Sequence, residues 1–261
     1  MEFDCIDLQR RNGLVQIQLN RPESGNSMNV ALLRQLAKAM RNCEEDENVR
    51  CVVLTGKGRF FCVGGDPGNF DGADDYGAVV RETTHHLNAA ILSMVRMRAP
   101  VVVSINGPAA GAGLSLCLAG DIVLASASAT FASAFIALGL PPDGGLARAL
   151  FRRVGETKAR EMLMLNRKIT AAEAFQWGMI NNVVDAAGLP SAVDEICNRF
   201  MSGPTVAYGR IKALLAGADQ FGLEHQLQLE AKGVAESVNL GDGLEGIRAF
   251  REKRAARFTG L

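Results

Sequence analysis

The chain has 261 residues, with 28 Lys and Arg balanced by 28 Asp and Glu, and 48% of the residues are hydrophobic. The balanced charge and the lack of a basic stripe argue against nucleic acid as the main partner. No apolar run approaches the roughly 20 residues of a membrane span, and residues 1–4 lack the basic and apolar regions of a signal peptide. The six scattered cysteines include no C-x-x-C pair, so we expect reduced, buried thiols in a cytoplasmic protein.

The first third of the chain alternates strand and helix patterns. Residues 2–8 and 14–20 alternate apolar and polar side chains around Asn12-Gly13, which predicts a hairpin. The other elements expected here are, in chain order, a helix over about 30–45 capped by Asn29, a buried strand over 51–55, a loop over 56–66, a mobile and solvated segment over 71–77, and a helix over about 78–97.

The rest of the chain changes from strand-rich to helical near residues 190–204. This change predicts a strand-containing core over residues 1–195 and a helical region over 196–261. The expected elements are strands over 101–105, 122–125 and 180–184, helices over 114–119, 145–152 and 156–165, a helix from a capping box at Thr170-Ala171-Ala172-Glu173 through Trp177, and helical patterns over 189–258 broken at 203–204 and 241–243.

One stretch of the sequence indicates chemistry. The strand over 101–105 runs into a Gly/Ala loop, Pro108–Gly113, that opens a helix, so free backbone N–H groups are expected at the loop. With the positive end of the helix they form a site for negative charge, or an oxyanion hole if that charge develops during a reaction. A dinucleotide fingerprint is disfavoured because Leu116 stands where its third glycine belongs. Downstream, Asp143 places a carboxylate on a sharp turn, and the combination points to enolate chemistry.

Several motifs together resemble the crotonase (enoyl-CoA hydratase/isomerase) superfamily over essentially the whole chain. They are Asn20-Arg21-Pro22, residues 61–66 (FCVGGD), residues 105–113 (INGPAAGAG), Asp121, residues 138–145 (LGLPPDGG), residues 171–180 and residues 249–254. The resemblance implies an α/β fold, a crotonase-like spiral of ββα units with a helical C-terminal trimerisation region. It also implies acyl-CoA thioester substrates and a homotrimer or a dimer of trimers.

The resemblance also assigns roles to individual residues. Asp143 is expected to move a proton between carbons of the acyl chain, and Ser115 and Phe135 stand where hydratases of the family carry glutamates. The backbone N–H groups of Val63 and Ala112 are the expected oxyanion donors. The expected pocket residues are Gly64, Asp66, Gly111, Ser115, Phe135 and Leu140, the expected CoA-binding residues are Arg21, Lys57, Arg59, Phe250 and Lys253, and no metal or separate cofactor is expected.

Simpler interpretations stand beside these roles. The Gly/Ala loop can serve close helix packing alone, and Pro-Asp-Gly is common turn chemistry. Adjacent helical residues point about 100° apart, so at most one of His85 and His86 faces a pocket, and both suit a solvated or capping role. Asp66 is expected mainly to bond loop amides, and Asp121 to be structural.

The leading functional hypothesis is an acyl-CoA isomerase that shifts a double bond or rearranges an epoxide through a thioester enolate. The alternatives are a hydratase that uses Asp143 with a water, and a non-catalytic acyl-CoA-binding protein. A hydrolytic dehalogenase of the family is disfavoured, because it pairs its aspartate with a histidine and a tryptophan where this chain has Asn88 and Phe135.

Overall fold

The computed structural model describes residues 3–261 and opens with the expected hairpin, strands β1 (Ile6–Arg11) and β2 (Leu14–Leu19). Asn12 and Gly13 both adopt positive φ, 49° and 87°, as a two-residue type I′ turn requires. The strands pair antiparallel, Ile6 opposite Leu19 and Arg11 opposite Leu14. The predicted first strand, 2–8, therefore starts and ends later than expected, and residue 2 itself lies outside the described residues.

A six-stranded sheet in the order β1-β2-β3-β4-β6-β9 forms the centre of the molecule. Its other members are β3 (Cys51–Gly56), β4 (Val101–Ile105), β6 (Ile122–Ser126) and β9 (Asn182–Val184), and all pairs after the hairpin are parallel. Every residue of β4 is buried, which explains its unbroken apolar run: the strand is covered on both faces. The α/β class predicted from the sequence is confirmed.

A second sheet was not predicted. It contains only β5 (Ala109–Ala110), β7 (Thr130–Ala132) and β8 (Ile169–Thr170), and strands of two or three residues leave no periodic pattern in a sequence. The pair β5–β7 sets Ala109 opposite Phe131 and Ala110 opposite Ala132. This sheet therefore fixes the backbone immediately before the Gly/Ala loop.

The helices of the core begin and end largely where local signals predict. Asn29 caps the first, its side chain accepting the N–H of Leu32 at 2.8 Å, and Thr170 and Glu173 form the expected reciprocal capping box. These helices are α1 (Val30–Glu45), α2 (Tyr76–Arg96), α3 (Ala112–Leu118), α4 (Leu146–Leu165), α5 (Ala171–Gln176) and α6 (Leu189–Met201), with 3-10 turns η1 (Pro22–Ser24), η2 (Pro67–Phe70) and η3 (Phe135–Leu138).

Helices α2 and α4 differ in detail from the prediction. Asp75 caps α2 by accepting the N–H of Ala78 at 3.0 Å, so the helix starts at Tyr76, inside the segment expected to be mobile. Gly155, with φ 74° and ψ 169°, interrupts α4, and this break separates the two helices expected over 145–152 and 156–165.

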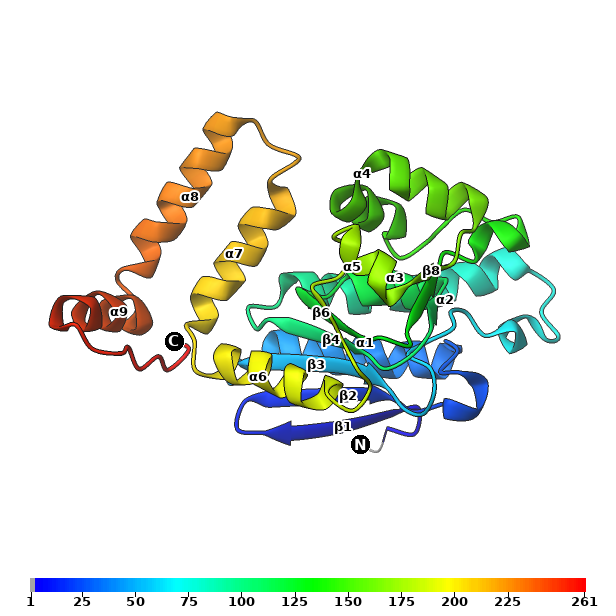
Figure 1. Cartoon of the computed structure of the whole chain (residues 1–261), viewed down its shortest axis with the longest axis horizontal. Coiled ribbons are helices and arrows are strands. Elements are labelled where there is room, and N and C mark those ends of the chain that lie inside the picture. Colours follow the sequence, from blue (N-terminus) through cyan, green and yellow to red (C-terminus); the bar gives the residue numbers. More distant parts are fainter. Residues whose placement is uncertain (1–2) are drawn as a thin grey trace.

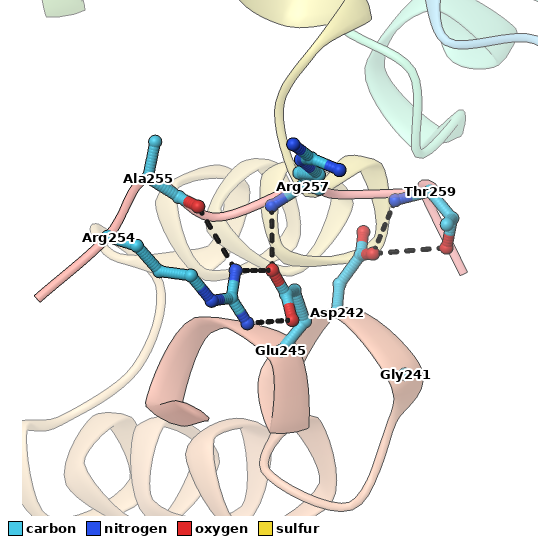
Figure 2. A pocket seen from close by; sticks show the side chains of 7 residues that line it. All are labelled: Gly241, Asp242, Glu245, Arg254, Ala255, Arg257 and Thr259. Carbon is cyan, nitrogen blue, oxygen red and sulfur yellow. Dashed lines mark hydrogen bonds and ion pairs between the residues drawn. The ribbon is translucent and has the colours of Figure 1, made fainter. Parts of the chain in front are cut away.

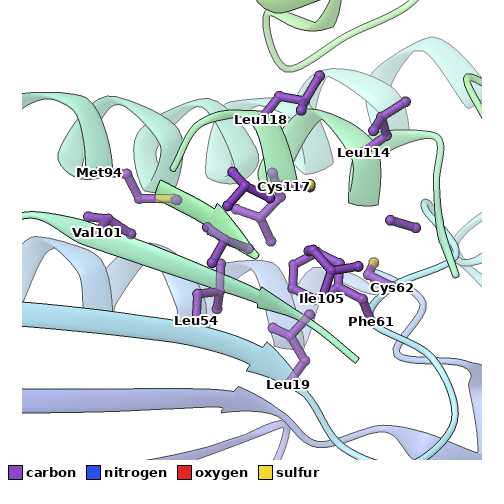
Figure 3. Packing of buried hydrophobic residues seen from close by; sticks show 14 of the residues in the cluster. Leu19, Leu54, Phe61, Cys62, Met94, Val101, Ile105, Leu114, Cys117 and Leu118 are labelled. Atoms are coloured by element: carbon purple, nitrogen blue, oxygen red, sulfur yellow. The ribbon is translucent and has the colours of Figure 1, made fainter. Parts of the chain in front are cut away.

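The main hydrophobic core fills the space between the sheet and helices α1, α2 and α3. Figure 3 shows Leu54, Val101 and Ile105 of the sheet facing Met94 of α2 and Cys117 of α3, with Met94 next to Val101. A smaller cluster lies where α6 packs on β3, β4 and β6; it contains Cys51, Val53, Val102, Leu124, Leu189, Val193 and Cys197. All six cysteines are free and buried, as expected from their apolar surroundings.

Helices α7 (Thr205–Gly217), α8 (Leu223–Ser237) and α9 (Gly241–Glu252) form an arm that stands off from the core (Figure 1). The C-terminal tail is tied along α9: Glu245 pairs with Arg254 at 2.6 Å, and buried Asp242 accepts the N–H of Thr259 (Figure 2). Asp242 also accepts the N–H of Gly260 at 2.8 Å. Large apolar side chains on the arm stay exposed, among them Leu223, Leu227, Val234 and Phe250. None of the helices within residues 3–261 is long and apolar enough to cross a membrane.

A buried ion pair attaches α7 to the core. The Lys212 ammonium lies 2.7 Å from Asp121 and donates to the carbonyls of Met94 and Ala99 at 2.8 and 3.0 Å. Asp121 also accepts the N–H of Val101 at 2.7 Å. Burial raises the pKa of the Asp121 carboxyl and lowers that of the Lys212 ammonium, the usual response to desolvation. Asp121 is therefore structural, as predicted, but its partner was not identified from the sequence.

Replacing Lys212 with Met should destabilise the protein markedly, because it leaves the Asp121 carboxylate in the interior without its cation. Removing one partner of a buried pair costs about 3 kcal/mol at the lower end of the usual range, which corresponds to a Tm lower by about 6–12 °C for a chain of this size. Thermal unfolding monitored by circular dichroism measures this. Arg199→Met breaks an exposed pair with Glu195 on α6 and should change Tm little; equal losses in both variants would contradict the structural role of Lys212.

Candidate functional site

Backbone segments 62–66 and 109–115 lie against each other at the end of the main sheet. The N–H of Ala110 donates to the carbonyl of Cys62 at 2.9 Å. A Cβ on Gly113 would lie 2.3 Å from that same carbonyl oxygen, so only glycine allows this approach. A Cβ on Gly64 would lie 3.5 Å from the amide nitrogen of Ala112. The structure thus brings together the two loops that the sequence predicted to supply the oxyanion donors.

Only some backbone amides of these two loops are open, that is, have an N–H group without a hydrogen-bond acceptor. The N–H of Val63 donates to the carbonyl of Gly25 at 3.1 Å, so the prediction that Val63 is an oxyanion donor is wrong. The N–H of Gly111 is also used, by the carbonyl of Ala132 at 3.2 Å. The amides of Gly65 and Ala112 have no acceptor among residues 3–261. The structure therefore leaves the amides of Gly65 and Ala112 available as donors, one from each loop.

Gly65 owes its open amide to a short parallel bridge with Met28. The N–H of Met28 donates to the carbonyl of Gly64 at 2.8 Å, and the N–H of Asp66 donates to the carbonyl of Met28 at 3.1 Å. In a parallel bridge the residue between these two bonds points its own N–H the other way. The sequence contained no local signal for this choice, because Gly25 and Met28 lie far from the loop along the chain.

The turn that carries Asp143 packs on the same helix as the open amide of Ala112. Ser115, one turn along α3, donates its hydroxyl to the backbone carbonyl of Asp143 at 3.0 Å. Gly144 has φ 56°, and a Cβ there would lie 2.8 Å from the Ser115 side chain and 3.0 Å from Leu87. Because a larger residue would be both strained and in collision, Gly144 fixes the turn against α2 and α3.

The Asp143 carboxyl group is held in an unfavourable environment for a charge. Its Oδ1 atom is buried and has no hydrogen-bond partner among the described residues. Burial is the main cause that raises the pKa of Asp143 above its ordinary value of 3.8. Unpaired buried polar atoms are rare in folded proteins and mark sites of chemistry when they also face reactive geometry. Asp143 is therefore a better acid/base candidate than its turn sequence alone suggested.

The predicted pocket residues differ in burial and in the hydrogen bonds that they make. Ser115 is buried and serves the Asp143 turn, which leaves its hydroxyl no free proton to donate. Phe135 is half-buried against the core at the start of η3, and its carbonyl accepts the N–H of exposed Leu140 at 3.1 Å. Both residues lie on the segment that leads to Asp143, and their role as pocket walls stays a prediction.

The predicted CoA-binding residues do not all face solvent. Arg21 donates to the carboxylate of Asp66 at 2.6 Å, so its guanidinium is engaged by the loop and does not face solvent as a phosphate ligand would. Lys57 pairs with Asp7 at 3.2 Å on the surface, and the guanidinium of Arg59 lies over the Phe60 ring at 5.8 Å. Phe250 and Lys253 lie on the arm, and a single chain does not bring them to the loops of the site (Figure 1).

His85, His86 and Asp66 lie at the surface or within the loops and make local contacts. His86 faces α1, where it accepts the Arg34 Nε–H at 3.3 Å, and His85 is exposed on the helix surface. Asp66 accepts the N–H of Gly68 at 3.0 Å, which confirms that it bonds loop amides. No cluster of three His, Cys, Asp or Glu side chains within the described chain has the arrangement of a metal site.

A cavity of about 430 Å³ lies beside the Asp143 turn. Its walls come from α2, α3, α4 and α7 and include Ile91, Ser115, Gly144, Arg148 and Lys212. Arg148 donates to the carbonyl of Ala216 and to Asp219, both at 3.0 Å, so its charge is already partnered. Lys212 and Asp121, which also line the cavity, are paired with each other at 2.7 Å.

The structure thus combines open amides on two adjoining loops with a buried carboxyl on a turn that is bonded to α3. The structure is similar to a solved enoyl-CoA hydratase from Bacillus anthracis, with a TM-score of 0.92 and 30% identity over 99% of this chain and 100% of that chain. A family model described as enoyl-CoA hydratase/isomerase matches residues 9–260. The chain belongs to the enoyl-CoA hydratase/isomerase family.

Relatives within the family differ in the reaction that their names state. The chain is 36% identical to a 1,2-epoxyphenylacetyl-CoA isomerase from Escherichia coli K12, over 100% of this chain and 99% of the relative. It is 31% identical to a 4-chlorobenzoyl coenzyme A dehalogenase from an Arthrobacter species, over 95% of this chain and 91% of the relative. The family is thus shown, and the names of its members do not decide between reactions for this chain.

Proposed function

We propose that this enzyme is an acyl-CoA isomerase that shifts a double bond, or rearranges an epoxide, through a thioester enolate. The observation that carries the proposal is the unpaired, buried Oδ1 of Asp143 on a turn that is bonded to α3, the helix whose first amide is open. A single carboxyl group that both removes and returns a proton is what an isomerase needs.

In the proposed reaction the Asp143 carboxylate takes a proton from the acyl carbon next to the unsaturated system. The electron pair left behind moves into the thioester, and its carbonyl oxygen becomes the enolate oxygen. The amides of Gly65 and Ala112 hold that oxygen, and one such donor typically lowers a barrier by about 3–4 kcal/mol. Protonated Asp143 then returns the proton to the other end of the conjugated system, so the reaction needs no redox cofactor or metal.

A hydratase that uses Asp143 with a water is the second candidate, supported by the name of the similar solved structure. Hydration needs a second group to orient and deprotonate the water. The Ser115 hydroxyl is used by the Asp143 carbonyl, and Phe135 has no acid, which disfavours this candidate. A non-catalytic acyl-CoA-binding protein is the third, and it gives no reason for the unpaired Asp143 oxygen.

We also propose that the CoA moiety meets Lys57 and Arg59 from this chain and Phe250 and Lys253 from a neighbouring copy. Support comes from the exposed apolar side chains on the arm, including Phe250, which is 85% exposed in the single chain. Burial of such side chains favours association. The expected assembly is a homotrimer or a dimer of trimers, in the cytoplasm.

The test is a panel of CoA thioesters with purified enzyme, read by mass spectrometry and NMR. We expect β,γ-unsaturated acyl-CoA or the epoxide of an aromatic acyl-CoA to be converted without a change in mass. A mass gain of one water from α,β-unsaturated acyl-CoA at the higher rate would favour the hydratase. Tight binding without turnover of any member would favour the binding protein.

The pH dependence gives a further prediction. The base form of Asp143 is required at the start of the reaction, and burial raises the pKa of that carboxyl above 3.8. We therefore expect kcat/KM to fall with decreasing pH through a midpoint above 3.8, and to be flat at higher pH where the carboxylate is fully formed. Steady-state rates between about pH 4 and 9, with circular dichroism to confirm the fold at each pH, measure this. An acid limb at the ordinary aspartate value would contradict the buried-base assignment.

A further inference from the structure

The peptide that presents the open Gly65 amide is held on both sides. Its bridge to Met28 fixes one side. On the other side Asp66 uses both carboxylate oxygens: Oδ1 accepts the N–H of Gly68 at 3.0 Å, and Oδ2 accepts from Arg21 at 2.6 Å. The Asp66 side chain, which follows Gly65 in the sequence, is therefore held in place by the guanidinium of Arg21 from a distant loop.

Arg21 reaches both segments that orient Gly65. The same Nη1 that binds Asp66 also donates to the carbonyl of Ser27, which precedes Met28 in the chain. One guanidinium thus joins the Met28 segment to the Asp66 segment across the bridge that orients Gly65. The pair is mostly shielded from water, with the Arg21 and Asp66 side chains only 23% and 18% exposed.

Arg21 is itself well supported. Its N–H donates to the side-chain oxygen of Asn26 at 2.9 Å. Asn26 is fully buried, and its Nδ2 donates to the carbonyls of Lys57, Phe60 and Phe61. The backbone around Arg21 is therefore tied to the same loop that leads into Gly65, which limits relative movement of the two segments.

We propose that Arg21 is a positioning residue for the oxyanion hole: through Asp66 and Ser27 it sets the direction of the Gly65 amide. The inference rests on the proposed function in using Gly65 as an oxyanion donor. Donors of this kind must lie about 2.7–3.1 Å from the developing oxygen, and a displacement of about 1 Å can cost about 100-fold in rate. Charge-assisted hydrogen bonds suit this task because they are short and directional.

Kinetics of Arg21→Met and Asp66→Asn test the proposal. We expect kcat lower by about 10- to 100-fold in each, KM within about threefold of the parent, and a double variant no worse than the poorer single variant. Arg21→Lys should recover part of kcat, because an ammonium can still reach Asp66. Arg10→Met is the matched control, since Arg10 pairs with Asp46 at the same 2.6 Å on the surface of β1; it should keep parental kinetics. Parental kcat in folded Arg21→Met and Asp66→Asn overturns the proposal.

A truncated substrate separates positioning from CoA binding. If Arg21 held a CoA phosphate, its loss would raise KM for the CoA thioester and leave the rate with the corresponding pantetheine thioester, which lacks the nucleotide, unchanged. The positioning role requires the same loss of kcat with both substrates. A change confined to KM for the CoA thioester therefore overturns the proposal.

A spectroscopic measurement works without turnover. Butyryl-CoA and phenylacetyl-CoA labelled with ¹³C at the thioester carbonyl should show a lowered C=O stretching frequency when bound to the parent. We expect the shift to decrease in Arg21→Met and Asp66→Asn and to persist in Arg10→Met. If the parent polarises the carbonyl but isomerises no thioester, the proposed function fails and the positioning role stands. If the shift is equal in parent and variants, or if neither thioester binds the parent, the positioning role fails.

Discussion

Replacing Asp143 with Asn should lower kcat by at least about 100-fold, because general acid–base catalysis by one group contributes about 10²–10⁴. Asn has nearly the shape of Asp but neither accepts nor returns a proton at neutral pH. The turn itself should survive, since Ser115 donates to the backbone carbonyl of residue 143 and not to its side chain. Thioester binding, measured by calorimetry, should therefore stay within a few fold of the parent.

The same substitution should raise stability. Burial raises the folded-state pKa of Asp143, so the native state holds that proton more tightly than the unfolded chain. The resulting stabilisation is complete below the unfolded value, near 3.8, and is lost as pH rises through the raised pKa. At neutral pH the folded parent therefore carries the full cost of a poorly solvated carboxylate, and the neutral amide of the Asp143→Asn variant does not.

The size of this gain is about 1 kcal/mol, the difference between leaving a charged group and leaving a neutral amide without a hydrogen-bond partner. For a chain of this length that is a Tm higher by about 2–4 °C. The Tm difference between Asp143→Asn and the parent should grow between about pH 4 and pH 8. Asp74→Asn, at an exposed position before α2, should change neither kcat nor Tm. A variant that loses activity and also loses stability at neutral pH would show that Asp143 is a turn-former.

Local signals predicted the parts of the fold that depend on neighbours in sequence. Asn29 and Thr170 cap helices through residues three positions away, and Gly155 breaks α4 by its own backbone conformation. The strand β4 is identified by its apolar run because both of its faces are covered. Strands as short as β5 carry no such pattern, and their existence depends on partners elsewhere in the chain.

The sequence predicted that the two loops meet, but it did not predict which backbone N–H of the first loop lacks an acceptor. The residues around 63 and 112 were expected to meet, and Ala110 and Cys62 do join the two loops. Which amide of the first loop stays open depends on Gly25, which takes the Val63 N–H, and on Met28, which turns the Gly65 N–H outward. Similarly, Lys212 finds Asp121 only through packing of α7 on the core. These hydrogen bonds and ion pairs depend on tertiary contacts, so the sequence of a loop alone does not predict them.

Replacing Ala112 with Pro should lower kcat by about 10²–10³, the usual cost of one lost oxyanion donor. Ala112 is the first residue of α3, a position where the fixed φ of proline suits the helix and the missing N–H breaks no intrahelical bond. The N–H of Ala112 also has no acceptor elsewhere in residues 3–261, so its removal orphans no carbonyl. The substitution therefore deletes the donor and keeps the backbone. It also places the proline Cδ where the amide hydrogen pointed, so we expect KM for the thioester to rise as well.

A substitution that keeps the amide at the same position separates loss of the donor from a general effect of changing residue 112. Ala112→Gly keeps the backbone N–H at the first residue of α3, so it changes the side chain and leaves the donor in place. We expect kcat close to the parent for Ala112→Gly and a Tm within about 2 °C of the parent for Ala112→Pro. The C=O stretch of a bound labelled thioester should lose part of its shift in Ala112→Pro alone. A residual frequency shift is expected in Ala112→Pro, because the Gly65 amide remains in that variant. Loss of this residual shift in the double variant Ala112→Pro/Asp66→Asn would show that the two amides act on one oxygen.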